Sequence, residues 1–95
     1  MNEVIEGRVA SLSEKGDLIT DIQVEQFADA GQLAELRVRV GPHETLGLHP
    51  PDHGEPESTM IAVLGSGGFV EIGIVGMNMG DMLGIAAGDK VTIES

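Results

Sequence analysis

Residues 4–22 read VIEGRVASLSEKGDLITDI, and this segment decides the fold. Branched and apolar side chains dominate Val4–Leu12, with polar residues interspersed, which is typical of a β-strand. Lys15-Gly16-Asp17 predicts a tight turn, since glycine and aspartate tolerate the backbone angles of a reversal. Leu18–Ile22 is again rich in branched apolar residues, so the segment is expected to form a β-hairpin.

The rest of the chain repeats this pattern of short strands separated by turns. Period-two alternation is clearest at residues 36–40, and prolines place an irregular exposed loop at 49–58. Helical turns are expected at 24–30 and after Asn78, a candidate helix cap, with Gly84 ending the second. Further strands are predicted at residues 45–48, 60–64, 69–75 and 90–94. The prediction is a single all-β domain over residues 1–95, mainly antiparallel: a small seven-stranded barrel or sandwich with one or two short helical turns.

The composition restricts how such a domain is stabilised. The chain has 95 residues, no cysteine, no tryptophan, no tyrosine and two phenylalanines. Disulfides and thiolate–zinc sites are therefore excluded, and the core must consist of aliphatic residues and methionine. A domain of this size buries only about 60% of its unfolded surface. Self-association would add buried area, so a homo-oligomer is expected.

The charge balance bears on partners and location. Sixteen acidic residues against five basic ones give a net charge of −11. Such a surface repels nucleic acids and anionic membranes, and neither is expected as a partner. Solubility is the main interpretation of the acidity, and a cationic partner or substrate is the alternative. Neither a signal-peptide pattern nor an apolar run long enough to span a bilayer is present, so a cytoplasmic location is expected.

Catalytic and metal-binding motifs are sparse. The chain lacks cysteine and a Gly-x-Ser-x-Gly elbow, and no nucleophile–base–acid set can be assembled, so no enzymatic activity is expected. His43, His49 and His53 lie near carboxylates and are candidate ligands for zinc or nickel. Their spacing fits no known motif, and solvated histidines are the main interpretation of this loop.

Several short runs, in order along the chain, resemble one family. They are EGRV at residues 6–9, GDLITDI at 16–22, GFVEIGI at 68–74, MLGI at 82–85 and GDKV at 88–91. Together they resemble the C-terminal β-barrel domain of the S-adenosylmethionine (SAM) hydrolases, also called SAM hydroxide adenosyltransferases, whose relatives include halogenating enzymes. The resemblance extends from Glu6 to Ile93. It implies a β-barrel and a trimeric homo-oligomer, with ligand sites between one subunit's catalytic domain and the next subunit's barrel. This chain has no room for that catalytic domain.

The hairpin carries the first set of implied ligand residues. In the family this stretch typically reads Asp-Arg-Phe-Gly-Asn-Leu-(Ile or Val)-Thr-Asn-Ile, and its Asp, Phe and first Asn help to hold the adenosyl group. Here Ser13 stands in place of that Asp, Lys15 in place of Phe, and Asp17 in place of the first Asn. Asp21 replaces the second Asn. The matching residues, which build the hairpin, are Gly16, Leu18, Thr20 and Ile22.

The second set follows a glycine-rich turn. Residues 65–73 read GSGGFVEIG, where the family usually has Asn-Ser-x-Gly-x-Leu-Glu-Ile-Ala. Ser66 matches that run, and Asn78 stands where a serine is common a few residues later. Backbone groups of this segment approach the adenine in the family, so the resemblance implies that Ser66 and Asn78 lie near a nucleoside.

Three functions follow from these observations. The first is a stand-alone, non-catalytic relative of the barrel domain that serves as an oligomerisation or protein-interaction module, since the family's ligand-facing residues are exchanged. The alternative is a nucleoside- or SAM-binding module that completes the site of a separate catalytic chain. A metal-binding loop protein is the third. SAM and adenosine are the only small-molecule ligands that the resemblance implies.

Overall fold

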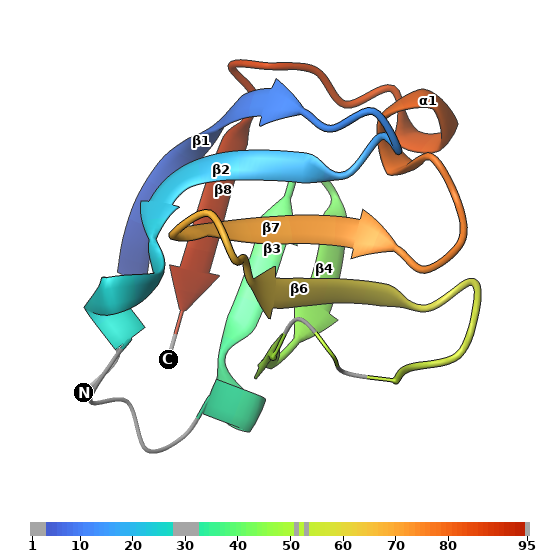
Figure 1. Ribbon diagram of the computed structural model, residues 1–95. Helices are drawn as coiled ribbons and strands as arrows, with labels where there is room; N and C mark the ends of the chain where they lie inside the picture. The colour runs from blue at the N-terminus through green and yellow to red at the C-terminus, as the bar shows by residue number, and fades with distance from the viewer. Residues whose placement is uncertain (1–3, 28–32, 51, 53, 95) are drawn as a thin grey trace.

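The described residues form one curled sheet of eight strands with three short helical segments (Figure 1). This computed structural model describes residues 4–27, 33–50, 52 and 54–94. The strands are β1 (Val4–Leu12), β2 (Leu18–Gln23), β3 (Arg37–Val40), β4 (His43–Leu46), β5 (Leu48–His49), β6 (Met60–Leu64), β7 (Phe69–Ile74) and β8 (Lys90–Glu94). The helical segments are η1 (Val24–Phe27), η2 (Leu33–Glu35) and α1 (Met79–Leu83).

The strand order closes the sheet into a barrel that is nearly complete. The order is β4-β3-β8-β1-β2-β7-β6-β5, and every pairing is antiparallel except β5 with β6. Near the gap in the barrel, the Thr45 hydroxyl of the edge strand β4 donates a hydrogen bond of 2.8 Å to the Met60 carbonyl of β6, the neighbour of the other edge strand β5. The predicted small, mainly antiparallel all-β barrel is therefore confirmed.

The sequence pattern predicts seven strands, one fewer than the described residues form. A single strand was expected at residues 45–48, but Gly47 adopts a φ of +91° and separates β4 from β5. An L-residue disfavours this conformation, whereas glycine takes it readily, so the chain turns there. The extra turn lets β5 leave β4 and pair parallel to β6, which makes eight strands and a mixed sheet.

The barrel interior is filled by aliphatic side chains, as the composition predicts. Side chains alternate across each strand, and the inward ones of β3 and β8 pair directly, Val38 with Ile93 and Val40 with Val91. Phe27 is the aromatic residue of this cluster, whereas Phe69 is 37% exposed. The remaining core residues include Val9, Leu18, Ile22, Leu36, Leu48, Ala62, Val70, Ile72, Met79 and Ile85.

The β1–β2 turn (residues 13–17) is a compact loop that its own hydrogen bonds hold. The Ser13 N–H donates to the Asp17 carbonyl at 2.9 Å, and the Ser13 hydroxyl accepts from the Asp17 N–H at 3.0 Å. Gly16 has a φ of +85° and donates its N–H to the Ser13 carbonyl. The predicted tight turn is thus confirmed, and glycine is required at its centre.

Thr20 links β2 to β7 where their regular pairing is interrupted. Ile19 pairs with Glu71, but the next partner pair is Gln23 with Phe69, so β2 has two extra residues in this interval. The buried Thr20 hydroxyl donates to the Val70 carbonyl at 2.7 Å and accepts from the Ile22 N–H at 3.2 Å. The side chain thus supplies bonds that the irregular ladder lacks.

The helical predictions agree with the structure where it describes them. The Asn78 side chain caps α1 by accepting from the Asp81 N–H at 2.9 Å, and Gly84 ends the helix in the left-handed conformation. The helical turn predicted at 24–30 is a 3₁₀ helix over Val24–Phe27. Residues 28–30 of the predicted turn lie outside the described part of the chain. Within the described ranges, no helix is long and apolar enough to cross a bilayer.

Candidate binding pocket

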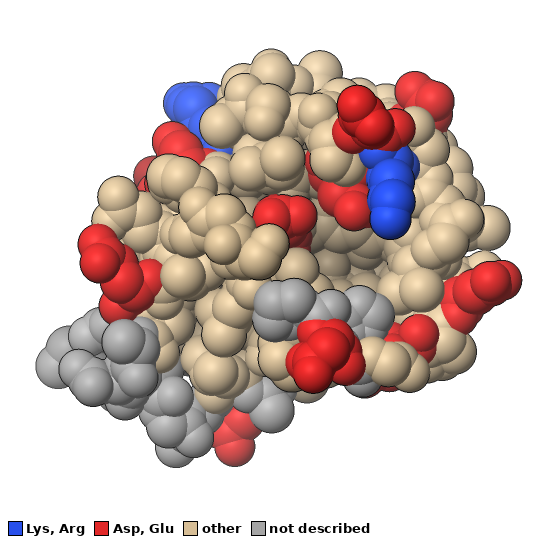
Figure 2. All heavy atoms as spheres, in the orientation of Figure 1, with Lys and Arg blue, Asp and Glu red and all other residues tan. Residues whose placement is uncertain are grey.

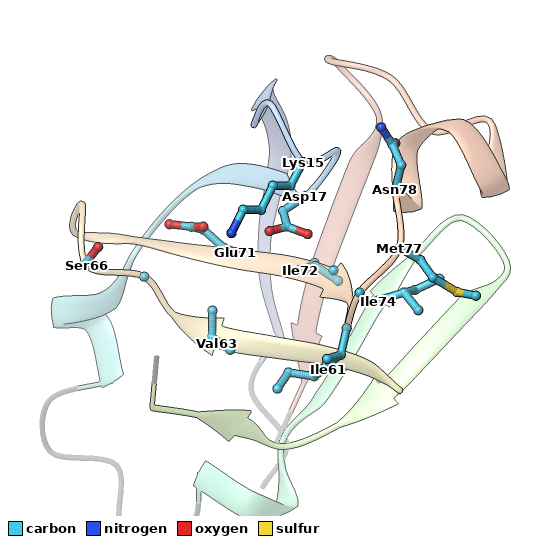
Figure 3. Close-up of a pocket in the computed structure, with 14 residues that line it drawn as sticks. Lys15, Asp17, Ile61, Val63, Ser66, Glu71, Ile72, Ile74, Met77 and Asn78 are labelled. Carbon is cyan, nitrogen blue, oxygen red and sulfur yellow. The ribbon is translucent and has the colours of Figure 1, made fainter. Parts of the chain in front are cut away.

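A pocket of about 710 Å³ lies outside the barrel, against the outer surface of β6 and β7 (Figure 3). Its walls come from the β1–β2 turn, the glycine-rich turn after β6, and residues 75–78 before α1. In the space-filling view the same face is hollowed, with acidic side chains and one cationic side chain around the hollow (Figure 2). We refer to this site as the outer pocket. Its volume is typical of small-molecule sites.

The floor of the outer pocket is apolar, although it is the outer face of a strand. Ile61 pairs with Gly73, and Val63 pairs with Glu71, so all four residues point away from the barrel interior. Ile61 is only 4% exposed and yet does not belong to the core cluster. The continuous apolar run at residues 60–64 is explained by this arrangement, because one face of β6 lines the core and the other lines the pocket.

Asp17 forms part of the upper wall and lies directly over β7. A Cβ atom at Gly73 would overlap the Asp17 Oδ1 atom, so the absence of a side chain at Gly73 makes room for this carboxylate. Burial raises the pKa of the Asp17 carboxyl above its ordinary value, and the positive charge of Lys15 acts in the opposite direction. The charged form of Asp17 is therefore partly desolvated in the folded protein.

Glu71 occupies an equivalent position over the glycine-rich turn. A Cβ atom at Gly65 would overlap the Glu71 Oε2 atom, so this carboxylate also lies against a glycine. Within the residues that the structure describes, neither Glu71 nor Asp17 has a hydrogen bond or ion pair to its carboxylate. Both groups are half-buried and face the pocket. Their acceptor oxygens are therefore available to a ligand.

Lys15 is the cation among the described residues that line the pocket. Its side chain is exposed and extends from the β1–β2 turn toward the gap between Asp17 and Glu71 (Figure 3). No oxygen of a described carboxylate lies within 4.0 Å of the Lys15 ammonium. The lysine is thus close enough to influence Asp17 but is not locked in an ion pair.

Asn78 lies between the β1–β2 turn and α1, at the pocket wall next to the helix. Its Oδ1 atom caps the helix, and the Gly80 N–H donates to the Gly16 carbonyl at 3.1 Å. A Cβ atom at Gly16 would overlap the Asn78 amide group. Contact between these two segments therefore requires glycine at position 16, and it fixes the pocket wall relative to the helix.

The structure brings together most of the ligand residues that the sequence indicated. Lys15, Asp17, Ser66 and Asn78 all line the outer pocket, although they come from opposite halves of the chain. Ser13 lies behind the wall, where its hydroxyl holds the Asp17 N–H. Asp21 lies elsewhere: its carboxylate is exposed and accepts from the backbone N–H of Arg8 on β1.

Other pocket residues were not recognised from the sequence. Glu71 stands where the resembled run also has Glu but is not among the predicted site residues, and neither are Ile61, Val63 and Met77. An apolar residue on both faces of β6 is the signal that could have revealed the floor. Ile61 points outward and is nevertheless buried, so segments outside the barrel must cover it.

The histidines do not form a site in the described part of the chain. His43 lies on β4, and His49 on β5 places its Nδ1 atom 3.8 Å from the Glu55 Oε1 atom. His53 lies outside the described residues. Among the described residues, no group of three or more histidine, aspartate or glutamate side chains is arranged to hold a metal ion.

Comparison with known proteins gives a fold but no named function. No family model matches the chain, and no curated protein matches it. An uncharacterised conserved protein from Thermotoga maritima superposes with a TM-score of 0.80 and 25% identity, over 98% of this chain and 36% of that one. A conserved hypothetical protein from Thermus thermophilus superposes with a TM-score of 0.71 and 25% identity, over 93% of this chain and 34% of that one. The chain thus spans about a third of the length of these solved structures.

Proposed function

We propose that this chain is a non-catalytic β-barrel module that forms one wall of a nucleoside-binding site, whose other wall belongs to a separate catalytic chain. The observation that carries the proposal is the outer pocket. It gathers Lys15, Asp17, Ser66 and Asn78, which come from the two runs that resemble the adenosyl-contacting runs of SAM hydrolases. Adenosine and SAM are the ligands that this resemblance suggests.

The pocket chemistry is compatible with a nucleoside. The apolar floor, accessible at Val63 because Ile61 is only 4% exposed, offers a dry surface for the flat face of a base. The carboxylates of Asp17 and Glu71, which have no partner among the described residues, can accept hydrogen bonds from ribose hydroxyls or an exocyclic amine. The aromatic residue of the resembled hairpin is absent, but the 40% exposed Met77 offers a thioether that can contact a ring.

The incomplete enclosure of the pocket supports a shared site. Its described walls, the β1–β2 turn and the segments at the two ends of β7, leave the pocket open as a hollow at the surface. In the two solved structures, the matching barrel is about a third of a longer chain. A barrel of this kind therefore occurs beside further polypeptide, which is the arrangement that a composite site needs.

Thermal denaturation in the presence of SAM, adenosine or methionine tests the proposal. We expect the melting temperature to rise with the concentration of adenosine and SAM and to stay constant with methionine. A ligand at 100 times its Kd stabilises the folded state by about 2.7 kcal/mol. For a domain of this size that corresponds to a shift of roughly 10–20 °C.

A matched pair of variants localises the binding. Val63→Glu places a charge on the apolar floor and should abolish the ligand-induced shift. Leu46→Glu changes an apolar residue that is 59% exposed on β4, outside the pocket, and should leave the shift intact. Constant melting temperatures with millimolar adenosine and SAM would refute a nucleoside site on the isolated module.

Self-association is a second candidate function that exposed apolar side chains favour. The described residues that combine large apolar side chains with high exposure are Val4, Leu12, Leu46, Phe69, Met77 and Met82. A chain with so few aromatic residues gains buried area by covering them. At about 100 µM protein, sedimentation velocity should show a homo-oligomer, which is a trimer by the family resemblance. This concentration is roughly the upper range of ordinary Kd values for stable assemblies, so a monomer there would exclude this role.

A further inference from the structure

We propose that the outer pocket selects organic cations, and that the positive group of the ligand binds between Asp17 and Glu71, where Lys15 now extends. The inference concerns the same site as the proposed function. It does not require that the ligand be a nucleoside, so the two can fail separately. The class of ligand is a small monocation with an apolar or aromatic body.

The two carboxylates are the first support for a cationic ligand. Each lies against a glycine, Asp17 on Gly73 and Glu71 on Gly65, at positions that a Cβ atom would block. Both are half-buried, and neither has a hydrogen bond or ion pair to its carboxylate within the described residues. A partly desolvated carboxylate without a partner gains more from a cation than an exposed one does. The raised pKa of Asp17 has the same cause.

The position of Lys15 is the second support. Its ammonium extends toward the space between the carboxylates, which marks that space as favourable for positive charge (Figure 3). The side chain is exposed and lies beyond ion-pair distance of any described carboxylate. A long flexible stem can move aside, so a ligand cation can replace the lysine. We therefore infer that Lys15 is a tethered competitor of the ligand.

The charge distribution over the molecule argues against an anionic ligand. The other four basic residues of the chain lie on the outer face of β1, β3 and β8, away from the pocket: Arg8, Arg37, Arg39 and Lys90. Two of these arginines and Lys90 are near Glu44 or Glu6. Lys15 alone would have to neutralise an anion beside two carboxylates and within a chain of net charge −11.

The apolar floor specifies the rest of the ligand. The half-buried Val63 is its accessible part beside the 4% exposed Ile61, and the 40% exposed Met77 extends it toward α1. An inorganic cation would leave this surface uncovered. An amine with a hydrocarbon chain or a ring system would bury it and keep its charge at the carboxylates.

Two series of ligands, each with a constant body and a terminal group that is cationic, neutral or anionic, test the inference. The first consists of 5′-amino-5′-deoxyadenosine, adenosine and adenosine monophosphate, and the second of hexylammonium, hexanol and hexanoate. Binding is followed at pH 7 by chemical-shift changes of the backbone amides. In each series we expect the cation to bind tightest and the anion weakest, with shifts concentrated at residues 15–17, 61–66 and 71–78.

Variants of the charged residues separate the roles. Lys15→Met should strengthen binding of the cations about tenfold and leave the neutral ligands nearly unchanged, because it removes a like charge a few ångströms away. Asp17→Asn and Glu71→Gln should each weaken cation binding about tenfold. Glu25→Gln changes an exposed acidic residue of η1 outside the pocket and serves as the control.

The outcomes distinguish the cation inference from the proposed nucleoside function. If the anions bind tightest and Lys15→Met abolishes their binding, Lys15 is an anion anchor and the cation inference is wrong, whereas a nucleoside site remains. If hexylammonium binds in the pocket but no adenosine derivative does, the nucleoside function is wrong and the cation inference stands. If no ligand of either series shifts the pocket amides, both are wrong.

Discussion

Replacing Gly16 with alanine should destabilise the fold through two separate effects. Gly16 has a φ of +85°, and an L-residue in a left-handed conformation costs about 1–2 kcal/mol. The new methyl group would also overlap the Asn78 amide, which must then leave its position. Asn78 caps α1 through the Asp81 N–H, and loss of such a cap costs about 1 kcal/mol. The sum is about 2–3 kcal/mol.

The magnitude is large for this domain. A chain of 95 residues is expected to have a free energy of unfolding of about 5–14 kcal/mol. Urea denaturation followed by far-ultraviolet circular dichroism is the suitable assay, because the chain lacks tryptophan and tyrosine. The midpoint should fall while the dependence on urea stays the same, since the exposed area changes little.

Two comparisons isolate the overlap from the backbone strain. Gly88→Ala is the matched control, since Gly88 has a φ of +97° and nothing lies within 4 Å of its added Cβ atom. It should cost only the strain, about 1–2 kcal/mol. In the Gly16→Ala/Asn78→Ala double variant the cap can be lost only once, so the two costs should fall short of additivity by about 1 kcal/mol. Equal costs for the two glycine variants, or strict additivity, would refute the reasoning.

Three further predictions address the barrel and the pocket. Thr20→Val should lower the free energy of unfolding by about 1–3 kcal/mol, because the Val70 carbonyl loses its buried donor; Thr20→Ser, which keeps the hydroxyl, should lose less in the same urea titration. Asp17→Asn should stabilise the protein at pH 7 and give no gain near pH 3: burial raises the folded-state pKa of Asp17, so its charged form costs stability above that pKa, and the cost disappears as pH falls below the unfolded value. An equal gain at both pH values, measured by thermal denaturation, would contradict this. Gly73→Ala should displace the Asp17 carboxylate and weaken binding of hexylammonium in the amide-shift titration, even though the charge of the pocket is unchanged; unaltered binding would show that Asp17 does not need its place over β7.

The fold was largely predictable because its local signals agree with one another. The strand expected at Val4–Leu12 has the bounds of β1, and the apolar run at 60–64 is β6. The cap at Asn78 and the stop at Gly84 were read from residue type alone. In each case a short-range cause decides the structure: alternation, a side chain that bonds a free N–H, or a glycine at positive φ.

The parallel pairing of β5 could not be foreseen in the same way. It depends on where the chain goes after Gly47, and β5 has only two residues, Leu48 and His49. Such a strand has too few positions to show a period. Its place is set by Leu48 entering the core beside Ala62, which is a contact between distant segments.

The resemblance selected four of the residues that line the pocket, Lys15, Asp17, Ser66 and Asn78, but it predicted neither the pocket itself nor its floor. Sequence resemblance selected residues on the β1–β2 turn and in the segment before α1, but it also selected Asp21, which contacts Arg8 on another side of the hairpin. The side of a strand on which a residue lies depends on register, and the extra residues of β2 between Ile19 and Gln23 alter that register. The apolar floor was missed because outward and inward faces cannot be distinguished in a continuous apolar run.

Three positions at which this chain differs from the resembled runs, 15, 17 and 73, are linked in the structure. In the runs that this chain resembles, these positions are typically Phe, Asn and Ala, whereas here they are Lys15, Asp17 and Gly73. A Cβ atom at position 73 would overlap the Asp17 carboxylate, so the aspartate and the glycine depend on each other. A hairpin that served folding alone would not need a glycine at position 73 to accommodate the Asp17 carboxylate. That carboxylate has no partner within the described residues. Lys15, Asp17 and Gly73 thus form one acidic wall that also carries a cation, and this arrangement favours the proposed binding role with a charged ligand over a role in assembly alone.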